Sequence, residues 1–596
     1  MLRRRWLYLV AVVAMLGQMA FAMVTTAVQL TPTIDEPVYL ATAEVYTQQH
    51  SLRYNPEHPP LGKLIMAAGL AFEDVGELDP AYPGSQSALG RHLLYESGNN
   101  PFRLLLAARM PIILLTLLFG LVVLAFARDV AGPVGGLIAL ALYSFSPDVI
   151  AHGSLATLDV PAAGLLFTAF WLVWRGRNRP YRYLPLAGLA LGAALATRAS
   201  ALPAVPLLVL LAALSMWHAQ RAREPQPPTA SEPADNPPLE KTTEEGTAGA
   251  PPKETAEGGT AGALPKEMTE EGTTDAPPKE TTVRSATTKR LLSSAAAAVG
   301  TGLIAVAVVW IVYLAVDPHL RWTTPVGLPH PGGLKGLAVD WLPFPQAYRD
   351  GLLMQFKLEL RTYNGFLLGH GYKGHLWFYL PAALVIKTPL GMLALWAAGA
   401  LTMIFIPRLR VAALYVLPVS AVLLLVAMTG SRSYGTRYAI FLPLFLAVAA
   451  GTVALVRIRW ARVTTALLVL FVAVSSLRTF PYYLPYSNEA FGGTADTHLN
   501  LHDSNVDWGQ DLARLAQKLK TDYPGEQTWL IYKGSGVPAY YGIDAADPYT
   551  VPVDQVHGIL VISDSRVALA SARLKQLLTG ATPIGQVGYS MTIYRR

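Results

Sequence analysis

Cysteine is absent from the 596-residue chain. No disulfide bond and no thiolate metal site can therefore form, and any folded part outside the cytoplasm must be stabilised by its own core. Charge is also scarce, because only 15% of the residues are charged while 52% are hydrophobic. A soluble core of this length needs much less apolar surface, so the composition excludes an ordinary soluble protein.

Two features of soluble nucleotide-binding proteins are missing as well. The sequence contains no phosphate-binding loop and no Rossmann glycine fingerprint, which argues against a nucleotide-sugar site. The formal net charge of +7 would favour nucleic acid in a soluble protein. Here the arginines stand in short loops beside apolar runs, as the positive-inside rule requires of a membrane protein, so we expect no nucleic-acid partner.

Long apolar runs are what the chain has in abundance. They recur at about the length that a helix needs to cross a hydrocarbon core, and this criterion predicts about eleven membrane helices. The first follows the basic start, Met1 to Arg5, and its apolar run is too long for a cleaved signal sequence. The others are expected at residues 102–127, 133–145, 155–174, 184–197, 202–217, 291–316, 377–406, 411–428, 438–456 and 463–477.

Basic clusters beside these runs predict one orientation. If the arginine-rich N-terminus is cytoplasmic, alternation of the spans places every such cluster in the cytoplasm. The clusters lie at residues 128, 175–182, 218–223, 407–410 and 457–462. The same alternation exports residues 31–101, the turn around Asp148, residues 317–376, the turn 429–437 and everything after residue 479. We therefore expect a multi-pass protein of the plasma membrane whose C-terminal part is extracytoplasmic.

The predicted organisation divides the chain into four parts. Residues 1–223 form an N-terminal membrane module with the exported loop 31–101, and residues 290–479 form a second with the exported loop 317–376. Between them, residues 224–289 have too few apolar side chains to offset the entropy of ordering, so we expect a disordered cytoplasmic loop. A tolerated insertion is favoured over a regulatory segment. Residues 480–596 contain alternating and helical patterns that predict a small α/β domain. The strand patterns lie at 528–534 and 558–564, and the helical patterns at 512–519 and 567–578.

The first exported loop begins with two adjacent carboxylates, Asp35 and Glu36, directly after the first helix. Crowding and desolvation near a membrane surface raise the pKa of a carboxylate toward the range of a general base. A structural interpretation is equally good, because Asp35 precedes an amphipathic pattern and would cap the first amides of that helix. The pair alone does not decide between the two.

The same loop continues with EHPPLGK, residues 57–63. Pro59 and Pro60 predict the start of a helix from whose first turn Lys63 projects. A lysine at headgroup depth could bind a phosphate, or it could anchor the helix at the interface. His58 has no partners at metal-ligand spacing, so the sequence predicts no metal site here.

Charged residues also mark the other exported turns. Asp159 lies at or just inside the exported end of its helix, where a carboxylate needs a cavity or a cationic partner. Arg198, Arg432 and Arg437 fall at exported turns and could neutralise a phosphate, because a guanidinium suits bidentate contact with phosphate oxygens. Each arginine taken singly is more typical of an interfacial anchor. Because all three arginines are predicted to lie on the same side of the membrane, they favour a common site.

Two later segments combine polar and aromatic residues. The long exported loop holds Tyr372 and His375, whose surroundings suit sugar stacking but also an interfacial belt. Lys387 follows at an undecided depth, either within a span or at its top. The motif DSNVDWGQD at residues 503–511 includes Asp507 and Trp508, and it could bind a polar ligand or cap its own helix.

Together these elements resemble the polytopic GT-C glycosyltransferases, in particular the family of protein O-mannosyltransferases, lipid A aminoarabinose transferases and their bacterial lipid-carrier-dependent relatives. The resemblance covers most of the chain outside residues 224–289. Its elements are the Asp35-Glu36 pair, EHPPLGK, HGSLATLD ending at Asp159, KTP at 387–389 and DSNVDWGQDL at 503–512. The family's eukaryotic members carry a different exported domain in mid-chain, and its lack here points away from a protein hydroxyl as acceptor.

The resemblance implies roles for individual residues. Asp35 would be the base that deprotonates the acceptor, supported by Glu36, while Asp159 would orient a cationic group or the acceptor. Lys63 would contact the phosphate of a polyprenyl-phosphate sugar. Further candidates for contact with the donor phosphate are His58, Arg198, Arg437 and Lys387, and candidates for acceptor or sugar contacts are Tyr372, His375, Asp507 and Trp508.

The resulting expectation is an inverting glycosyltransferase of the GT-C fold that moves a sugar from a polyprenyl phosphate to a lipid, glycan or protein acceptor in the cell envelope. The sequence requires no cofactor, and its carboxylates leave a divalent metal open. The alternative is a transporter or flippase of the lipid-linked sugar, but the charges lie at exported helix ends instead of mid-membrane. A non-catalytic scaffold would leave Asp35, Lys63 and Asp159 without a shared purpose.

Overall fold

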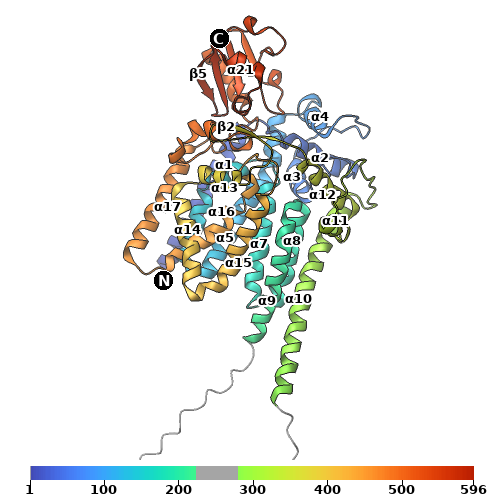
Figure 1. Ribbon diagram of the computed structural model, residues 1–596, viewed down its shortest axis with the longest axis vertical. Helices are drawn as coiled ribbons and strands as arrows, with labels where there is room; N and C mark the ends of the chain where they lie inside the picture. The colour runs from blue at the N-terminus through green and yellow to red at the C-terminus, as the bar shows by residue number, and fades with distance from the viewer. Residues whose placement is uncertain (1, 223–278) are drawn as a thin grey trace, which may run out of the picture.

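The computed structural model describes residues 2–222 and 279–596. Its described part is mostly helical, with a long helix bundle that carries a smaller layer of sheet and helices at one end (Figure 1). The helices of the bundle are α1 Leu2–Gln29, α5 Pro101–Ser144, α7 Asp159–Gly176, α8 Pro180–Thr197, α9 Val205–Arg221, α10 Lys279–Val316, α14 Leu390–Phe405, α15 Arg410–Ala427, α16 Leu442–Gly451 and α17 Arg459–Thr479.

The bundle helices coincide with the apolar runs, and a helix lies at each predicted span. Six described helices are long and apolar enough to cross a membrane, or seven if α13 (Tyr379–Lys387) and α14 count as one bent span. The predicted total of eleven is therefore not confirmed by this criterion. The structure defines a multi-pass α-helical membrane protein, because a hydrocarbon core accepts only segments that satisfy their own backbone hydrogen bonds.

Two breaks in the helices affect three of the predicted spans. Spans 102–127 and 133–145 form the single helix α5, which turns at Gly132, where φ is 77°. The predicted span 377–406 consists of α13 and α14, which meet at 116°. Pro389 follows the end of α13 and has no amide hydrogen to continue it, so the chain turns at the KTP motif.

Small residues let the bundle helices approach closely. Gly135 of α5 faces Gly451 of α16, and a Cβ added at either position would lie 2.7 or 2.6 Å from the other's carbonyl oxygen. Gly399 of α14 lies even closer to α16, since an added Cβ would be 2.3 Å from the carbonyl of Ala449. Such contacts are typical of membrane helices, where van der Waals packing drives association.

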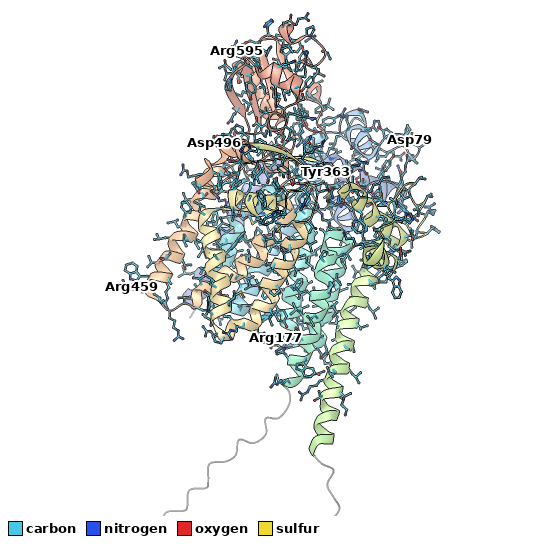
Figure 2. The ribbon with its side chains drawn as sticks, in the orientation of Figure 1. Asp79, Arg177, Tyr363, Arg459, Asp496 and Arg595 are labelled. Atoms are coloured by element: carbon cyan, nitrogen blue, oxygen red, sulfur yellow. The ribbon has the colours of Figure 1, made fainter. Side chains whose placement is uncertain are left out.

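Short elements gather at one end of the bundle (Figure 1). They are α2 Glu36–Gln49, α3 Leu61–Leu70, α4 Gln86–Arg91, α6 Pro147–Gly153, α11 Gly333–Asp340, α12 Gln346–Glu359, and the antiparallel hairpin β1 Asn364–Leu367 and β2 His370–Lys373. Figure 2 shows Asp79 and Asp496 at this end and Arg177 and Arg459 at the other. The segments predicted to be exported thus share one end, opposite the basic loops.

The C-terminal unit is a four-stranded sheet in the order β3-β4-β6-β5. Its elements are α18 Thr497–Asn500, α19 Leu512–Asp522, β3 Thr528–Ile531, β4 Ile559–Ser563, α20 Asp564–Ala568, α21 Ala572–Leu578, β5 Thr582–Val587 and β6 Met591–Arg595. β3 and β4 run parallel, and the other pairings are antiparallel. Alternate residues of β4 face two cores: Ile559 and Val561 pack with α19, and Leu560 and Ile562 with α21. The predicted strands and helices are confirmed, except that α20 and α21 replace one helix.

The predicted insertion at residues 224–289 lies mostly outside the described residues, which resume at Lys279 with the start of α10. The limits of the four predicted domains remain predictions.

Candidate functional site

Asp35 forms an ion pair at the end of the bundle that carries the short elements. It stands at the N-cap position of α2, but its carboxylate makes no capping hydrogen bond. Instead, Arg437 Nη1 donates to Asp35 Oδ2 at 2.7 Å. The capping interpretation is therefore wrong. The Asp35 side chain keeps 27% of its surface exposed, so an incoming group can reach it.

Arg437 is held between aromatic rings. Its guanidinium carbon lies 4.3 Å from the ring centre of Trp508 and 5.3 Å from that of Tyr438. Cations over aromatic faces are stabilised by the ring quadrupole, most strongly where water is excluded. The Nε of Arg437 is buried and has no hydrogen-bond partner among the described residues. One donor of a largely buried guanidinium therefore has no partner in the described chain.

A second ion pair adjoins the first. Asp159, buried at the start of α7, pairs with Arg198 at the end of α8. The guanidinium of Arg198 lies 5.8 Å from the ring centre of Tyr438, the ring that also faces Arg437. Both guanidinium groups thus lie near the ring of Tyr438, and the Asp35 and Asp159 pairs are neighbours.

Lys63 is enclosed near these pairs. The prolines begin α3 as predicted, and the Lys63 side chain is fully buried behind its first turn. Its Nζ donates to the carbonyl and side-chain oxygens of Asn55, both at 3.0 Å, and to the carbonyl of His58 at 2.7 Å. Within the described chain, no carboxylate reaches Lys63 at ion-pair distance. Burial lowers the pKa of Lys63 to about 7, and Glu57 only partly opposes this shift.

The pKa of His58 reflects the cations near it. Burial lowers the pKa of this imidazole well below its ordinary value, and the charges of Arg198, Lys63, Arg432 and Arg437 add to the effect. Arg432 is itself held by Glu359. All four cations therefore lie within electrostatic range of His58. The structure therefore brings together the EHPPLGK segment, both arginine turns and the start of α7.

Glu36 lies apart from this cluster. Its buried carboxylate receives two hydrogen bonds from Arg109, both 2.7 Å long, and others from the amides of Thr33 and Ala156 at 2.9 and 2.8 Å. Burial would raise the pKa of Glu36, but Arg109 and these amides hold it below its ordinary value. All its acceptor positions are used within the fold, so the predicted support of Asp35 is not what Glu36 does here.

Arg109 is a residue that reasoning from the sequence missed. It lies in α5, fully buried, and also donates to the carbonyls of Ala27 and Leu30. The sequence did contain a signal for Arg109, because an arginine inside a predicted membrane span needs a buried partner. Its role is to fix the end of α1 and the start of α2 against α5.

Lys387 makes its contacts with other residues of the protein. It ends α13, is buried, and donates from Nζ to the carbonyls of Leu484 and Asn505 at 2.5 and 3.0 Å. Asp148 Oδ1 lies 3.5 Å away as its counter-ion. The contacts place Lys387 at a helix bend as an internal tie, and they do not support the predicted contact with a donor phosphate.

Asp507 and Trp508 are also internal. Both side chains are buried, at 0% and 1% exposure, so neither is free to contact an acceptor or a sugar as predicted. Trp508 lies under Arg437, while Asp507 accepts from the amides of Gly509 and Ser565. The cap interpretation fails too, because Asp511, which precedes α19, makes no capping bond.

Tyr372 and His375 lie at the hairpin end of the site. Tyr372 belongs to β2 and is half-buried, with no hydrogen-bond partner for its hydroxyl in the described chain. His375 is exposed and its Nε2 lies 2.7 Å from the carbonyl of Met428. Their contact with an acceptor remains a prediction. Among the described residues, no group of three His, Asp or Glu side chains is placed to hold a metal ion.

The fold and the site define a multi-pass membrane protein with carboxylates and cations gathered at one end of its helices. Residues 103–229 match the family model described as dolichyl-phosphate-mannose-protein mannosyltransferase. This range includes Arg109, Asp159 and Arg198. Over this part of the chain, the match agrees with the resemblance to the mannosyltransferase family.

Comparisons with other proteins complete these findings. A search of curated proteins finds no match. Among solved structures, the chain is similar to ArnT from Cupriavidus metallidurans in the apo state, with 13% identity, a TM-score of 0.45 and coverage of 100% of this chain and 98% of that chain. It is also similar to ArnT from the same organism bound to undecaprenyl phosphate, with 12% identity, a TM-score of 0.43 and coverage of 98% and 97%.

Proposed function

We propose that this chain is an inverting glycosyltransferase that moves a sugar from a polyprenyl-phosphate donor to an acceptor at the extracytoplasmic face of the membrane. The family match supports a glycosyltransferase. The lipid-linked donor is supported by the site's position at the end of the bundle, where a phosphate on a membrane-embedded lipid would lie.

The observation that carries the proposal is a partly exposed carboxylate beside cations that are incompletely paired. The buried ammonium of Lys63 has only neutral oxygens as partners in the described chain, and Arg437 Nε has no partner. Buried charges of this kind are costly unless an anion completes them. Asp35 stands at the edge of this cluster with its surface partly open.

The chemistry follows from these positions. Asp35 accepts the proton of the acceptor hydroxyl or amine as the acceptor atom attacks the anomeric carbon. The bond from that carbon to the phosphate oxygen breaks on the opposite face, so the configuration inverts. The electron pair leaves on the polyprenyl phosphate, whose charge is stabilised by Arg437 and by Lys63. A phosphate is a good leaving group and needs no strong acid.

The test compares turnover in matched variants. Purified protein is incubated with polyprenyl-phosphate sugars, and released polyprenyl phosphate is measured for the wild type, Asp35→Asn and Lys63→Ala. Loss of a positioned base costs about 10²–10⁴-fold in rate, so Asp35→Asn should fall in this range. Asp79→Asn, an exposed carboxylate at the same end of the molecule (Figure 2), serves as control.

Two outcomes would count against the proposal. Full turnover in Asp35→Asn would reject the base, and an absence of turnover with every donor, together with donor binding, would favour a flippase of lipid-linked sugar.

A further inference from the structure

The motif DSNVDWGQD, residues 503–511, has no part in the chemistry described above, although it is buried almost throughout. It runs between the helix bundle and the C-terminal sheet. Its residues contact two segments that are far apart in the chain, the one that leads into Asp35 and the one that contains Arg437.

The first contact fixes the segment before Asp35. The amide of Ile34 donates to the carbonyl of Trp508 at 3.0 Å, and the amide of Thr31 donates to the carbonyl of Gln510 at 2.9 Å. The hydroxyl of Thr31 accepts from the amide of Leu512 at 3.2 Å. The backbone directly before Asp35 is therefore paired with the motif.

The second contact fixes the turn that contains Arg437. Asn505 Oδ1 accepts from the amide of Thr436 at 3.1 Å, and Ser504 Oγ donates to the carbonyl of Tyr434 at 2.5 Å. Gly435 lies so close that an added Cβ would be 2.5 Å from Ser504 Oγ, and its φ of 156° also favours glycine. The ring of Trp508 then supports the Arg437 guanidinium from below.

The C-terminal unit holds the motif in turn. Lys533, just after β3, pairs with Asp503, and Ser565, just after β4, accepts from the Asp503 amide at 2.8 Å. Tyr532 donates to the carbonyl of Gly509 at 2.6 Å. The carboxyl ends of parallel strands meet at one edge of a sheet, and here that edge abuts the motif.

We infer that DSNVDWGQD is a positioning clamp that sets the Asp35–Arg437 pair and makes its geometry depend on the C-terminal unit. Asn505 and Trp508 are the positioning residues for Arg437, and the backbone from Trp508 to Gln510 positions Asp35. The value of this geometry for catalysis rests on the proposed function, but the geometry itself can be tested without any donor.

The absence of cysteine makes a direct test available. In Asp35→Cys the single thiol lies beside Arg437, and a neighbouring cation favours the thiolate over the free thiol, whose pKa is about 8.5. The rate of reaction with a small water-soluble disulfide is measured against pH. Adding Trp508→Leu or Asn505→Ala should displace Arg437 and slow the reaction at neutral pH about threefold or more, with the pH curve shifted upward.

Three further variants define the outcome. Trp508→Phe keeps a ring under Arg437 and should restore the curve of Asp35→Cys. Trp174→Leu removes a ring at 4.3 Å from Arg177 at the other end of the bundle, so the curve should stay unchanged. Ser504→Ala removes only one hydrogen bond, so it should shift the pH curve less. It provides the test if Trp508→Leu and Asn505→Ala do not fold. An unshifted curve in folded Trp508→Leu, Asn505→Ala or Ser504→Ala would overturn the clamp.

Turnover separates this inference from the proposed function. With polyprenyl-phosphate sugars and Asp35 intact, Trp508→Leu and Asn505→Ala should lower kcat about tenfold or more with little change in KM, and Trp508→Phe should recover part of the rate. Shifted thiol curves without turnover in the wild type would reject the function and keep the clamp. Unshifted thiol curves with normal kcat in Trp508→Leu and Asn505→Ala would reject the clamp and keep the function, whereas shifted curves with normal kcat would reject its value for catalysis.

Discussion

Asp35 and Glu36 are neighbours in the chain, yet their surroundings give them different tasks. The Glu36 carboxylate points into the bundle and accepts hydrogen bonds from Arg109 and two backbone amides. Asp35 points toward the open end of the site and shares one oxygen with Arg437. The two adjacent residues therefore differ in role: Glu36 stabilises the fold, whereas an acceptor can reach Asp35.

Lys63 gives the donor site a predicted dependence on pH. Because burial lowers the pKa of Lys63 to about 7, its ammonium is charged below that pH and neutral above it. A sugar phosphodiester keeps its charge over this range, so its affinity should fall as pH rises above 7, by up to about tenfold per unit. Binding titrations between pH 6 and pH 9 measure this.

A charged replacement provides the control for Lys63. Lys63→Arg stays protonated over the whole range, and its affinity should vary little with pH. Identical pH curves for wild type and Lys63→Arg would show that this ammonium does not hold the phosphate.

The pair of Glu36 and Arg109 should dominate stability at the junction of α1, α2 and α5. Removal of one partner from a buried pair leaves an uncompensated charge and costs about 3–5 kcal/mol. We expect Arg109→Ala to lower the unfolding free energy of purified protein by this order. The double variant Glu36→Gln with Arg109→Met should lose less than the sum of the single changes, and strict additivity would contradict the pairing.

Reasoning from the sequence found the residues whose position follows from helix ends. Asp159, Arg198 and Arg437 stand at or beside span ends, and Asp35 and Lys63 stand at the starts of short helices on the same side. The structure gathers these residues. The sequence could not place Lys387 or Trp508. Their surroundings come from distant segments, since the Lys387 partners Leu484 and Asn505 lie 97 and 118 residues away.

Helices and strands were predicted best where the hydrophobic periodicity of the sequence alone determines them. The strands β3 and β4 and the helix α19 lie where their patterns indicated, because alternate residues face two separate cores. The bend between α13 and α14 was not predicted, because a continuous apolar run hides a turn at Pro389. Hydropathy measures length, whereas the direction of a helix depends on what it packs against.

The contact between the C-terminal sheet and the motif predicts a pH-dependent stability. Burial raises the pKa of Asp507 to about 7 against the charge of Lys533, and Asp564 adds to the rise. In the unfolded chain an aspartate ionises near pH 3.9, so between about pH 4 and pH 7 the folded state binds more protons. The contribution of Asp507 to stability should therefore fall as pH rises through this window and level off above it.

Asp507→Asn isolates this contribution. The variant cannot ionise, so its melting temperature in detergent should fall less between pH 4 and pH 7 than that of the wild type. Asp564, whose pKa burial raises to about 6, contributes a slope of the same sign. Parallel curves for the two proteins would contradict the assignment to Asp507.

The whole molecule separates its two ends by charge and by structure. Basic loops lie at the end where α9 and α10 approach the undescribed segment, and the site and the sheet lie at the other (Figures 1 and 2). The positive-inside rule predicts that the end with the site is extracytoplasmic. This arrangement suits an enzyme that meets its lipid donor within the membrane and its acceptor outside.

Sidedness can be measured with single cysteines at exposed positions. Gln576→Cys on α21 should react with a membrane-impermeant maleimide in intact expressing cells. Asn178→Cys, between α7 and α8, should react only after the membrane is permeabilised. The opposite pattern would place the site in the cytoplasm and reject the predicted orientation.

The most direct test of the account is a structure of Asp35→Asn with a polyprenyl-phosphate sugar bound. We predict that the phosphate lies within hydrogen-bond distance of Lys63 and Arg437, with the anomeric carbon facing residue 35. A phosphate bound elsewhere, with Lys63 still enclosed by Asn55 and His58 and no sugar near residue 35, would contradict the account.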